Sequence, residues 1–261
     1  MSDMFSNATA YERYMGRWSA RLAPLFAEFV PIRDGGRVLD VGCGTGSLIQ
    51  VLTESTRAAE IVGIDLARAF IQYARARFRD SRHEFVLGNA ANLPYPDTSF
   101  DCSLSHLVFQ LIPQVEQAAA EMRRVTRPGG IVAASGWDGM GLEMAAVLWE
   151  EARRLDSDAG GGAGKKRSCC GEGQLAALWR ATGLVDVKET PLRIRTEFTS
   201  FDDYWLPLLG GIGPAGSYVA GLVPRRRDAL REALFARLAG GRAGAPITLN
   251  ALARAVCGTV P

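Results

Sequence analysis

The segment VLDVGCGTGSLIQ carries three glycines at alternate positions, Gly42, Gly44 and Gly46, and Asp40 lies just before them. The apolar residues that precede the glycines predict a buried strand, and those that follow have the pattern of a helix. Glycine lets the backbone adopt a positive φ and approach a ligand closely. Open parallel sheets bind ligands at the carboxyl ends of their strands. The segment therefore predicts a ligand-binding turn.

The glycine spacing differs from that of the dinucleotide fingerprint, which would need a third glycine where the sequence has Ser47. Glycine-rich turns are also common for steric reasons alone. A second stretch, GGGAGKK, resembles a phosphate-binding loop, but Ala159 and Lys166 stand where that pattern needs Gly and Ser or Thr. Neither a hydride-transfer site nor a phosphate-binding loop is expected.

Polar residues at the ends of the next strands strengthen the prediction of a ligand site. Asp65 ends the second strand, where a carboxylate can accept hydrogen bonds from a ribose diol, although aspartate is also a common helix N-cap. Asn89 and Ala90 follow the third strand, where an amide and a backbone N–H could bind the edge of adenine; asparagine is also a common turn residue. Ser105 and His106 end the fourth strand.

Strands alternate with helices over residues 37–137, which predicts a Rossmann-like, mainly parallel sheet with helices on both faces. Residues 185–198 and 252–260 complete a seven-stranded sheet, and the long segment between them should form a helical cap. The other expected strands cover 37–42, 60–66, 83–90, 100–109 and 130–137, and the expected helices cover 8–30, 47–55, 69–80, 115–127, 143–155 and 173–184. The expected domains are N-terminal lid helices in 1–34, a cofactor-binding domain in 35–198 and 246–261, and the inserted cap in 199–245.

The composition limits the classes of partner. The chain has 261 residues with a formal net charge of +2, so a nucleic-acid partner is not expected. No apolar run is long enough to span a membrane, and the N-terminal residues lack the apolar core of a signal peptide, so we expect a cytoplasmic location and no membrane partner. The five cysteines fit no zinc pattern, and no metal is expected. Adjacent Cys169 and Cys170 are either two free thiols, a redox switch or a soft-metal site.

The ordered motifs VLDVGCGTG, GIDLA, GNAANLPYPDTSFD and EMRRVTRPGG resemble those of the class I S-adenosylmethionine-dependent methyltransferases. In particular they are similar to the broad family that includes the ubiquinone and menaquinone C-methyltransferases. YERYMGRWS and ARAVCGTVP resemble a bacterial subgroup whose substrates are mostly unassigned. The sequence departs from the family at Asn89, where aspartate is usual, but asparagine keeps an acceptor oxygen. It also lacks the Asp/Asn-Pro-Pro-Tyr motif of enzymes that methylate the amino groups of nucleic-acid bases.

The resemblance implies S-adenosylmethionine as the cofactor. Its methionine part would lie over Gly42, Gly44 and Gly46, with Asp40 near the ammonium or holding the loop. The other implied contacts are Asp65 with the ribose, Leu66 with the adenine face, Asn89 and Ala90 with the adenine edge, and Ser105 beside the methyl group.

Other implied roles are less determined. Tyr14, Arg17 and Trp18 on the N-terminal helix would close over the methionine carboxylate, or would only pack the helix onto the sheet. His106 is the candidate catalytic base, and a wall position without a proton role is the alternative. The glycine-rich loop at 158–168 and residues 8–20 are expected to order when ligands bind.

We expect methyl transfer to a small, apolar or aromatic molecule by in-line displacement at the sulfonium methyl. The alternatives are a regulatory protein that binds the cofactor without turnover and, disfavoured by Ser47, a hydride-transfer enzyme. Large apolar residues are abundant in the cap and in the segment after the fifth strand. Some of them form the cap's own core, and the rest would surround the acceptor; the set is Phe201, Tyr204, Trp205, Leu206, Leu208, Leu209, Tyr218, Trp137, Met140, Met144 and Trp149. The oligomeric state is not predicted.

Overall fold

A single sheet runs through the molecule. The computed structural model describes residues 5–159 and 169–261, so most of the glycine-rich loop lies outside the described residues. The strands are β1 (Arg37–Val41), β2 (Glu60–Asp65), β3 (His83–Leu87), β4 (Phe100–His106), β5 (Thr126–Leu142), β6 (Val185–Phe198) and β7 (Ile247–Thr259). Their order across the sheet is β3-β2-β1-β4-β5-β7-β6, and β7 runs antiparallel to both of its neighbours. The predicted mainly parallel, seven-stranded sheet is therefore confirmed.

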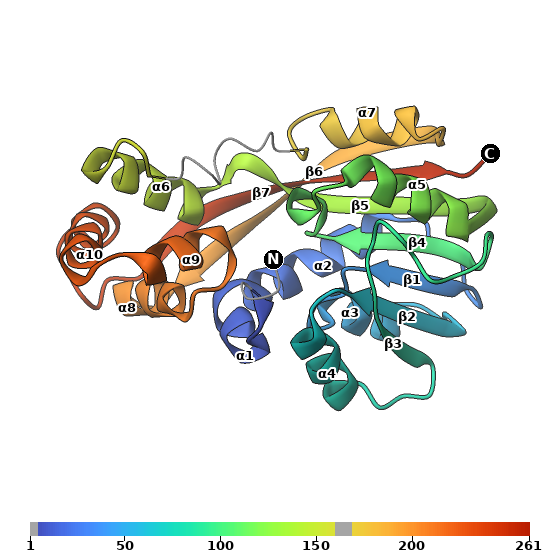
Figure 1. The fold of residues 1–261 in the computed structure, drawn as a ribbon, viewed down its shortest axis with the longest axis horizontal. Coiled ribbons are helices and arrows are strands. Elements are labelled where there is room, and N and C mark those ends of the chain that lie inside the picture. The colour runs from blue at the N-terminus through green and yellow to red at the C-terminus, as the bar shows by residue number, and fades with distance from the viewer. Residues whose placement is uncertain (1–4, 160–168) are drawn as a thin grey trace.

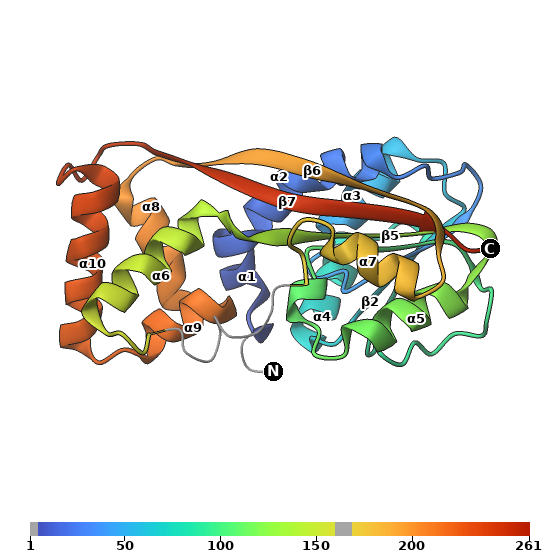
Figure 2. The same cartoon turned by 90° about the horizontal axis from the view of Figure 1, so that it is seen from above.

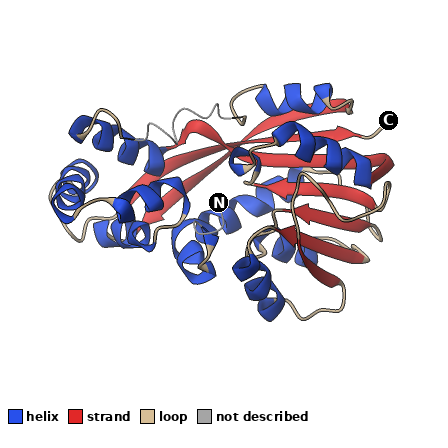
Figure 3. Ribbon diagram, in the orientation of Figure 1, coloured by secondary structure: helices blue, strands red, loops and turns tan. Residues whose placement is uncertain are grey.

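Helices cover both faces of this sheet (Figure 3). One apolar cluster joins the sheet to α2 (Arg17–Phe29), α3 (Ser47–Ser55) and α4 (Arg68–Arg77), and a second joins it to α5 (Val115–Val125) and α7 (Gln174–Ala181). Neighbouring residues of β1 enter different clusters, Val38 the first and Leu39 the second, because side chains alternate across a strand. A strand buried on both faces must be apolar at nearly every position, which explains the short unbroken apolar runs in the sequence.

The strand order changes direction between β1 and β4. From β1 the chain first adds β2 and β3 on one side and then crosses to add β4 and β5 on the other. Such a switch point leaves a crevice at the carboxyl ends of the strands. The glycine turn that follows β1 stands at this crevice.

The helical cap lies at one end of the molecule, beyond the tips of β6 and β7 (Figures 1 and 2). It contains α8 (Phe201–Trp205), α9 (Gly213–Gly221) and α10 (Pro224–Ala239), so the prediction of helices between the last two strands is confirmed. Helix α6 (Glu143–Leu155) packs with them: the Tyr204 hydroxyl donates to the Met144 carbonyl at 2.9 Å, and Arg237 pairs with Glu150 at 2.6 Å. We therefore propose that the cap comprises α6 as well as residues 199–245.

Several boundaries differ from the sequence prediction. The fifth helix ends at Val125 instead of reaching Pro128, because Thr126 already pairs with Phe100 as part of β5. Strand β7 begins at Ile247, which pairs with Phe198 at the far end of β6. The N-terminal helix is divided into α1 (Ala8–Tyr11), a π-helical segment (Glu12–Gly16) and α2.

The helices among the described residues include none that is both long and apolar enough to cross a membrane.

Candidate cofactor site

The turn after β1 needs glycine for two separate reasons. Gly42, Gly44 and Gly46 have φ values of +74°, +56° and +92°, which side chains of L-residues rarely allow. A Cβ atom on Gly42 would also lie 2.6 Å from the Val108 side chain. The Gly42 N–H donates to the Ile64 carbonyl at 2.7 Å, which ties the turn to the end of β2. The turn therefore exposes bare backbone at the carboxyl edge of the sheet.

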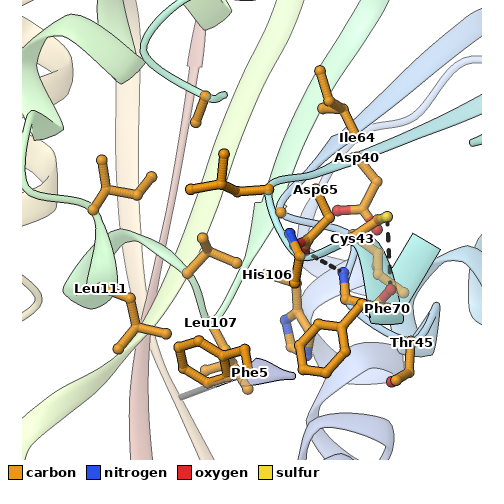
Figure 4. A pocket seen from close by; sticks show the side chains of 18 of the residues that line it. Phe5, Asp40, Cys43, Thr45, Ile64, Asp65, Phe70, His106, Leu107 and Leu111 are labelled. Carbon is orange, nitrogen blue, oxygen red and sulfur yellow. Dashed lines mark hydrogen bonds between the residues drawn. The ribbon is translucent and has the colours of Figure 1, made fainter. Parts of the chain in front are cut away.

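A cavity of about 1100 Å³, its open mouth included, lies over this turn. Figure 4 shows Asp40, Cys43 and Thr45 on one side of it, and Leu107 and Leu111 on the other. The polar side belongs to the glycine turn, and the apolar side belongs to the loop after β4. A ligand that fills the cavity must therefore combine polar and apolar parts.

Asp40 is the most unusual group in the cavity wall. Its side chain is 1% exposed, and neither carboxylate oxygen has a hydrogen-bond partner among the described residues. Burial, and to a smaller extent the charge of Asp65, raises the pKa of Asp40 to about 8. The buried hydroxyl of Thr45 also lacks a partner in the part of the chain that the structure describes. Buried polar groups are nearly always hydrogen-bonded, so these atoms indicate a ligand that carries donors or positive charge.

Asp65 holds the turn in place as well as facing the cavity. One carboxylate oxygen accepts the Gly44 N–H at 2.9 Å and the other accepts the Ala67 N–H at 2.7 Å. Each oxygen keeps a second lone pair for a ligand. Burial raises the pKa of this carboxyl, while the backbone donors oppose the shift. Since Ala67 is the N-cap residue of α4, Asp65 does not have the N-cap role considered above.

The residues expected to contact adenine also line the cavity. Leu66 lines the cavity and is 63% exposed, so its side chain is free to pack against a flat ligand. Asn89 and Ala90 lie at the end of β3. The Asn89 side-chain oxygen accepts the Ala91 N–H at 3.0 Å, so the side chain is already oriented by its own turn. The structure thus brings Asp40, Gly42, Gly44, Asp65, Leu66, Asn89, Ala90 and His106 together around one cavity.

His106 lies in the cavity wall with both ring nitrogens engaged. Nε2 lies 3.1 Å from the Ser19 carbonyl oxygen, which can only accept, so Nε2 carries the proton. Nδ1 then accepts the Ser135 hydroxyl at 2.9 Å. Phe26 stacks on the ring at 5.5 Å between centroids. Burial lowers the pKa of His106 to about 4, so the imidazole is neutral at neutral pH and its lone pair is occupied.

Two residues predicted to contact the cofactor lie elsewhere. Arg17 pairs with Asp203 at 2.9 Å and is not among the described residues that line the cavity. Tyr14 is buried near Gly213 of the cap and does not line the cavity either. The π-helical segment accounts for this placement, because its wider turn changes which side chains share a face. Both residues pack as the alternative expects, and their contact with a bound cofactor stays a prediction.

Ser105 and Gly46 also lie outside the described cavity lining. The fully buried Ser105 hydroxyl donates to the Val41 carbonyl at 2.8 Å and so joins β4 to β1. Gly46 precedes α3, where a Cβ atom would overlap the Phe78 ring. Both residues lie at the expected edge of the sheet, and their contact with the cofactor stays a prediction.

Other lining residues were not predicted. Tyr11 and Ser19 face the cavity from the N-terminal helix, and the π-helical segment that places them there has no clear sequence signal. The loop after β4 does have a sequence signal, because the apolar run LVFQLIP directly follows His106 at the ligand-binding edge of the sheet. The further lining residues that sequence reasoning missed include Phe5, Cys43, Thr45, Phe70, Leu107, Val108, Leu111 and Ile112.

The cap contributes no side chain to the described part of this cavity. Phe201, Tyr204 and Trp205 are instead buried in the cap's own core, where Phe201 and Trp205 stack. These three side chains form the cap's own core, and whether the remaining apolar residues of the cap surround the acceptor stays a prediction. Among the described residues, no group of three or more potential metal ligands is present.

Comparison with known proteins agrees with this geometry. Residues 39–134 match the family described as the methyltransferase domain. A malonyl-[acyl-carrier protein] O-methyltransferase of Serratia marcescens is 34% identical over 117 residues, which are 45% of this chain and 44% of that protein. A fatty-acid O-methyltransferase of Mycolicibacterium smegmatis is 40% identical over 97 residues, which are 37% of this chain and 35% of that protein. The matched segment spans less than half of either relative.

The likeness extends further in three dimensions. Phosphoethanolamine N-methyltransferase 2 of Haemonchus contortus, solved in complex with S-adenosyl-L-methionine, matches 97% of this chain and 56% of its own with a TM-score of 0.60. At 18% sequence identity this likeness concerns the fold alone.

Proposed function

Because residues 39–134 belong to the methyltransferase-domain family and the fold is of class I, we propose that this chain transfers the methyl group of S-adenosylmethionine to a small, apolar acceptor. One observation carries the proposal: the buried carboxylate of Asp40, which has no hydrogen-bond partner among the described residues, lies beside a bare glycine turn in a partly apolar cavity. The ammonium of the cofactor's methionine part is the kind of group that such a carboxylate needs.

The described residues fit each part of the cofactor. Asp40 and Thr45 offer the methionine ammonium acceptor oxygens that have no partner in the described part of the chain. Each Asp65 carboxylate oxygen has a second lone pair that can accept a hydrogen bond from the ribose diol. The hydrogen bond that Asp65 accepts from the Gly44 N–H fixes the position of the glycine turn. Leu66 and Asn89 flank the space for adenine.

The bound cofactor supplies a strongly electrophilic methyl group, so the protein has to align the acceptor and exclude water. Leu107 and Leu111 form the wall opposite the glycine turn, where an apolar acceptor would lie. His106 supports that wall: its contacts with Ser19 and Ser135 join the N-terminal helix to the sheet. We propose that His106 is a positioning residue, since Ser135 occupies its only lone pair.

An acceptor that is already ionised at neutral pH, such as a carboxylate, needs no base. This chemistry agrees with the named relatives, which act on a fatty acid and on a malonyl group. A carboxylate on an apolar chain is therefore the acceptor class that we propose to test first.

Two measurements test the proposed function. Calorimetry should detect binding of S-adenosylhomocysteine and no binding of NAD; NAD binding without S-adenosylhomocysteine binding would overturn it. Transfer of radiolabelled methyl groups to fatty acids, compared with phenols and amines, then identifies the acceptor class. Cofactor binding without turnover on any acceptor would favour the regulatory alternative.

A further inference from the structure

The adjacent cysteines Cys169 and Cys170 lie just before α7. Their sulfur atoms are 3.5 Å apart and share a hydrogen bond. Cys169 is partly exposed, whereas Cys170 is buried. The remaining cysteines, Cys43, Cys102 and Cys257, are all buried.

The pKa values of the two thiols are shifted in opposite directions. The hydrogen bond from Cys170 lowers the pKa of Cys169, because it stabilises the thiolate. The pKa of Cys170 is raised by the same interaction and by burial. The more accessible sulfur is therefore the better nucleophile, and its neighbour retains its proton.

A chain of contacts connects this pair to the cofactor cavity. The Cys170 sulfur lies 3.8 Å from the Gln110 side-chain oxygen and packs on Gly136 of β5, where any Cβ atom would overlap it. The Gln110 amide nitrogen donates to the Leu107 carbonyl at 2.6 Å. Leu107 lines the cavity and has a φ of +61°, so its backbone depends on such contacts.

We propose that Cys169 and Cys170 form a modification site that peroxides oxidise to an intrachain disulfide, and that this disulfide loosens the Leu107 wall of the cavity. A bonded pair of sulfurs lies only about 2 Å apart, so the Cys170 sulfur must move relative to the Gln110 side chain that it contacts. The hydrogen bond from the Gln110 amide to the Leu107 carbonyl is then weakened.

The chemistry balances with the peroxide as the only oxidant. The Cys169 thiolate attacks a peroxide oxygen, the O–O bond breaks, and a sulfenic acid and hydroxide form. The Cys170 sulfur then attacks the Cys169 sulfur: the S–S bond forms, the S–O bond breaks, and the oxygen leaves as water with the Cys170 proton. Two thiols lose two electrons in total, and hydrogen peroxide is reduced to two waters.

The first experiment treats the full chain with a limiting amount of hydrogen peroxide, alkylates the remaining thiols and maps the peptides by mass spectrometry. The peptide that contains Cys169 and Cys170 should lose two hydrogens, escape alkylation and recover both thiols with a reductant. Cys257→Ser should behave like the parent chain. Cys170→Ser should stop at a Cys169 sulfenic acid that dimedone traps. Full alkylation of the pair after oxidation, or oxidation of the buried cysteines in its place, would overturn the proposal.

A second experiment tests the connection to the cavity without relying on methyl transfer. Amide hydrogen exchange in residues 107–113 should be about threefold to tenfold faster after oxidation, the size expected for one lost hydrogen bond. Gln110→Ala should show the faster exchange without an oxidant. A double Cys169→Ser, Cys170→Ser variant should not respond to peroxide. Unchanged exchange in the oxidised chain would show that the disulfide does not reach the cavity wall.

Discussion

Asp40 combines two properties that oppose each other in a folded protein, a carboxyl group and almost complete burial. Because its pKa is raised to about 8, the group is mostly protonated near neutral pH in the ligand-free chain. In an unfolded chain it would ionise at about 3.9, so the folded state gradually loses stability as the pH rises between these values. A cationic ligand beside Asp40 stabilises the ionised carboxylate and so offsets the cost of burying it.

The first prediction concerns this coupling, and it rests on the proposed function. Binding of S-adenosylhomocysteine near neutral pH should release close to one proton, because the ligand ammonium favours ionised Asp40. Affinity should rise up to tenfold between about pH 6 and pH 7, a range in which the ligand's own ammonium stays charged. Calorimetry in buffers of different ionisation enthalpy measures the released proton.

Asp40→Asn is the matched control, since it keeps the shape and removes the titration. It should bind more weakly and release no proton. Binding by the parent chain without proton release would contradict the assignment of Asp40, whereas failure to bind at all would contradict the proposed function.

The second prediction concerns His106. His106→Asn should lower turnover less than about tenfold, because the lone pair that a base would need is already bound to Ser135, and a working base contributes about 10²–10⁴-fold. The turnover of the parent chain should show no ionisation of His106 near its ordinary pKa of about 6.5, since that pKa is lowered to about 4. A loss of more than a hundredfold with intact cofactor affinity would restore His106 as the base.

Asp65 leads to the third prediction. Asp65→Ala should weaken S-adenosylhomocysteine binding by about 2–3 kcal/mol, because charge-assisted hydrogen bonds to the ribose are lost together with the support of Gly44. Calorimetry at one pH measures the change. Asp80→Ala, on an exposed turn, is the control and should bind like the parent chain. Equal affinity of the Asp65 variant would remove Asp65 from the site.

Among the elements, the N-terminal helix has the most to do with access to the cavity. Tyr11 and Ser19 line the cavity on either side of the π-helical segment, and Tyr11 packs on Phe70 at 4.9 Å between ring centroids. The helix therefore closes one side of the cavity while Trp18 anchors it against Phe198. A helix that closes one side of a cavity in this way is suited to act as a lid.

The fourth prediction follows from this arrangement. Amide hydrogen exchange in residues 8–20 should become slower when S-adenosylhomocysteine is added, because a ligand in the cavity supplies contacts for Tyr11 and Ser19. Exchange in α10, far from the cavity, should not change and serves as the internal control. Equal rates in residues 8–20 with and without ligand would indicate a permanently packed helix.

Across the whole molecule, the sheet connects two separate regions, the cavity and the helical cap. The cofactor cavity lies over β1 to β4, whereas the cap is carried on the far ends of β6 and β7 (Figures 1 and 2). Helix α6, which directly follows β5, enters the cap core, so the two regions share an apolar cluster. We expect the cap and the sheet to unfold together.

The fifth prediction tests this connection. Tyr204→Phe should lower the free energy of unfolding by about 1 kcal/mol, because the buried Met144 carbonyl of α6 loses its hydroxyl donor. Urea unfolding followed by tryptophan fluorescence and circular dichroism measures the change, and both signals should follow a single transition. Tyr218→Phe, at a half-buried cap position, is the control and should change stability little. Two separate transitions would show that the cap is an independent unit.

Local patterns in the sequence determined much of the architecture. Helices α3 and α6 and strand β6 have the bounds that were predicted, because their periodicity and their flanking turn residues are properties of neighbouring residues. The glycine turn, Asp65 and Asn89 were also placed correctly, since a residue at the end of a parallel strand can lie at only one edge of the sheet.

Only the tertiary structure decided which side chains face the cavity. Ser105 and His106 are neighbours in one strand, yet the first joins two strands and the second lines the cavity. The π-helical segment exchanges Tyr14 for Tyr11, and the unpartnered oxygens of Asp40 become visible only when every neighbour is in place. The physical reason is that the direction of a side chain and the hydrogen bonds it finds depend on residues far away in the chain, whereas helix and strand patterns depend on residues nearby.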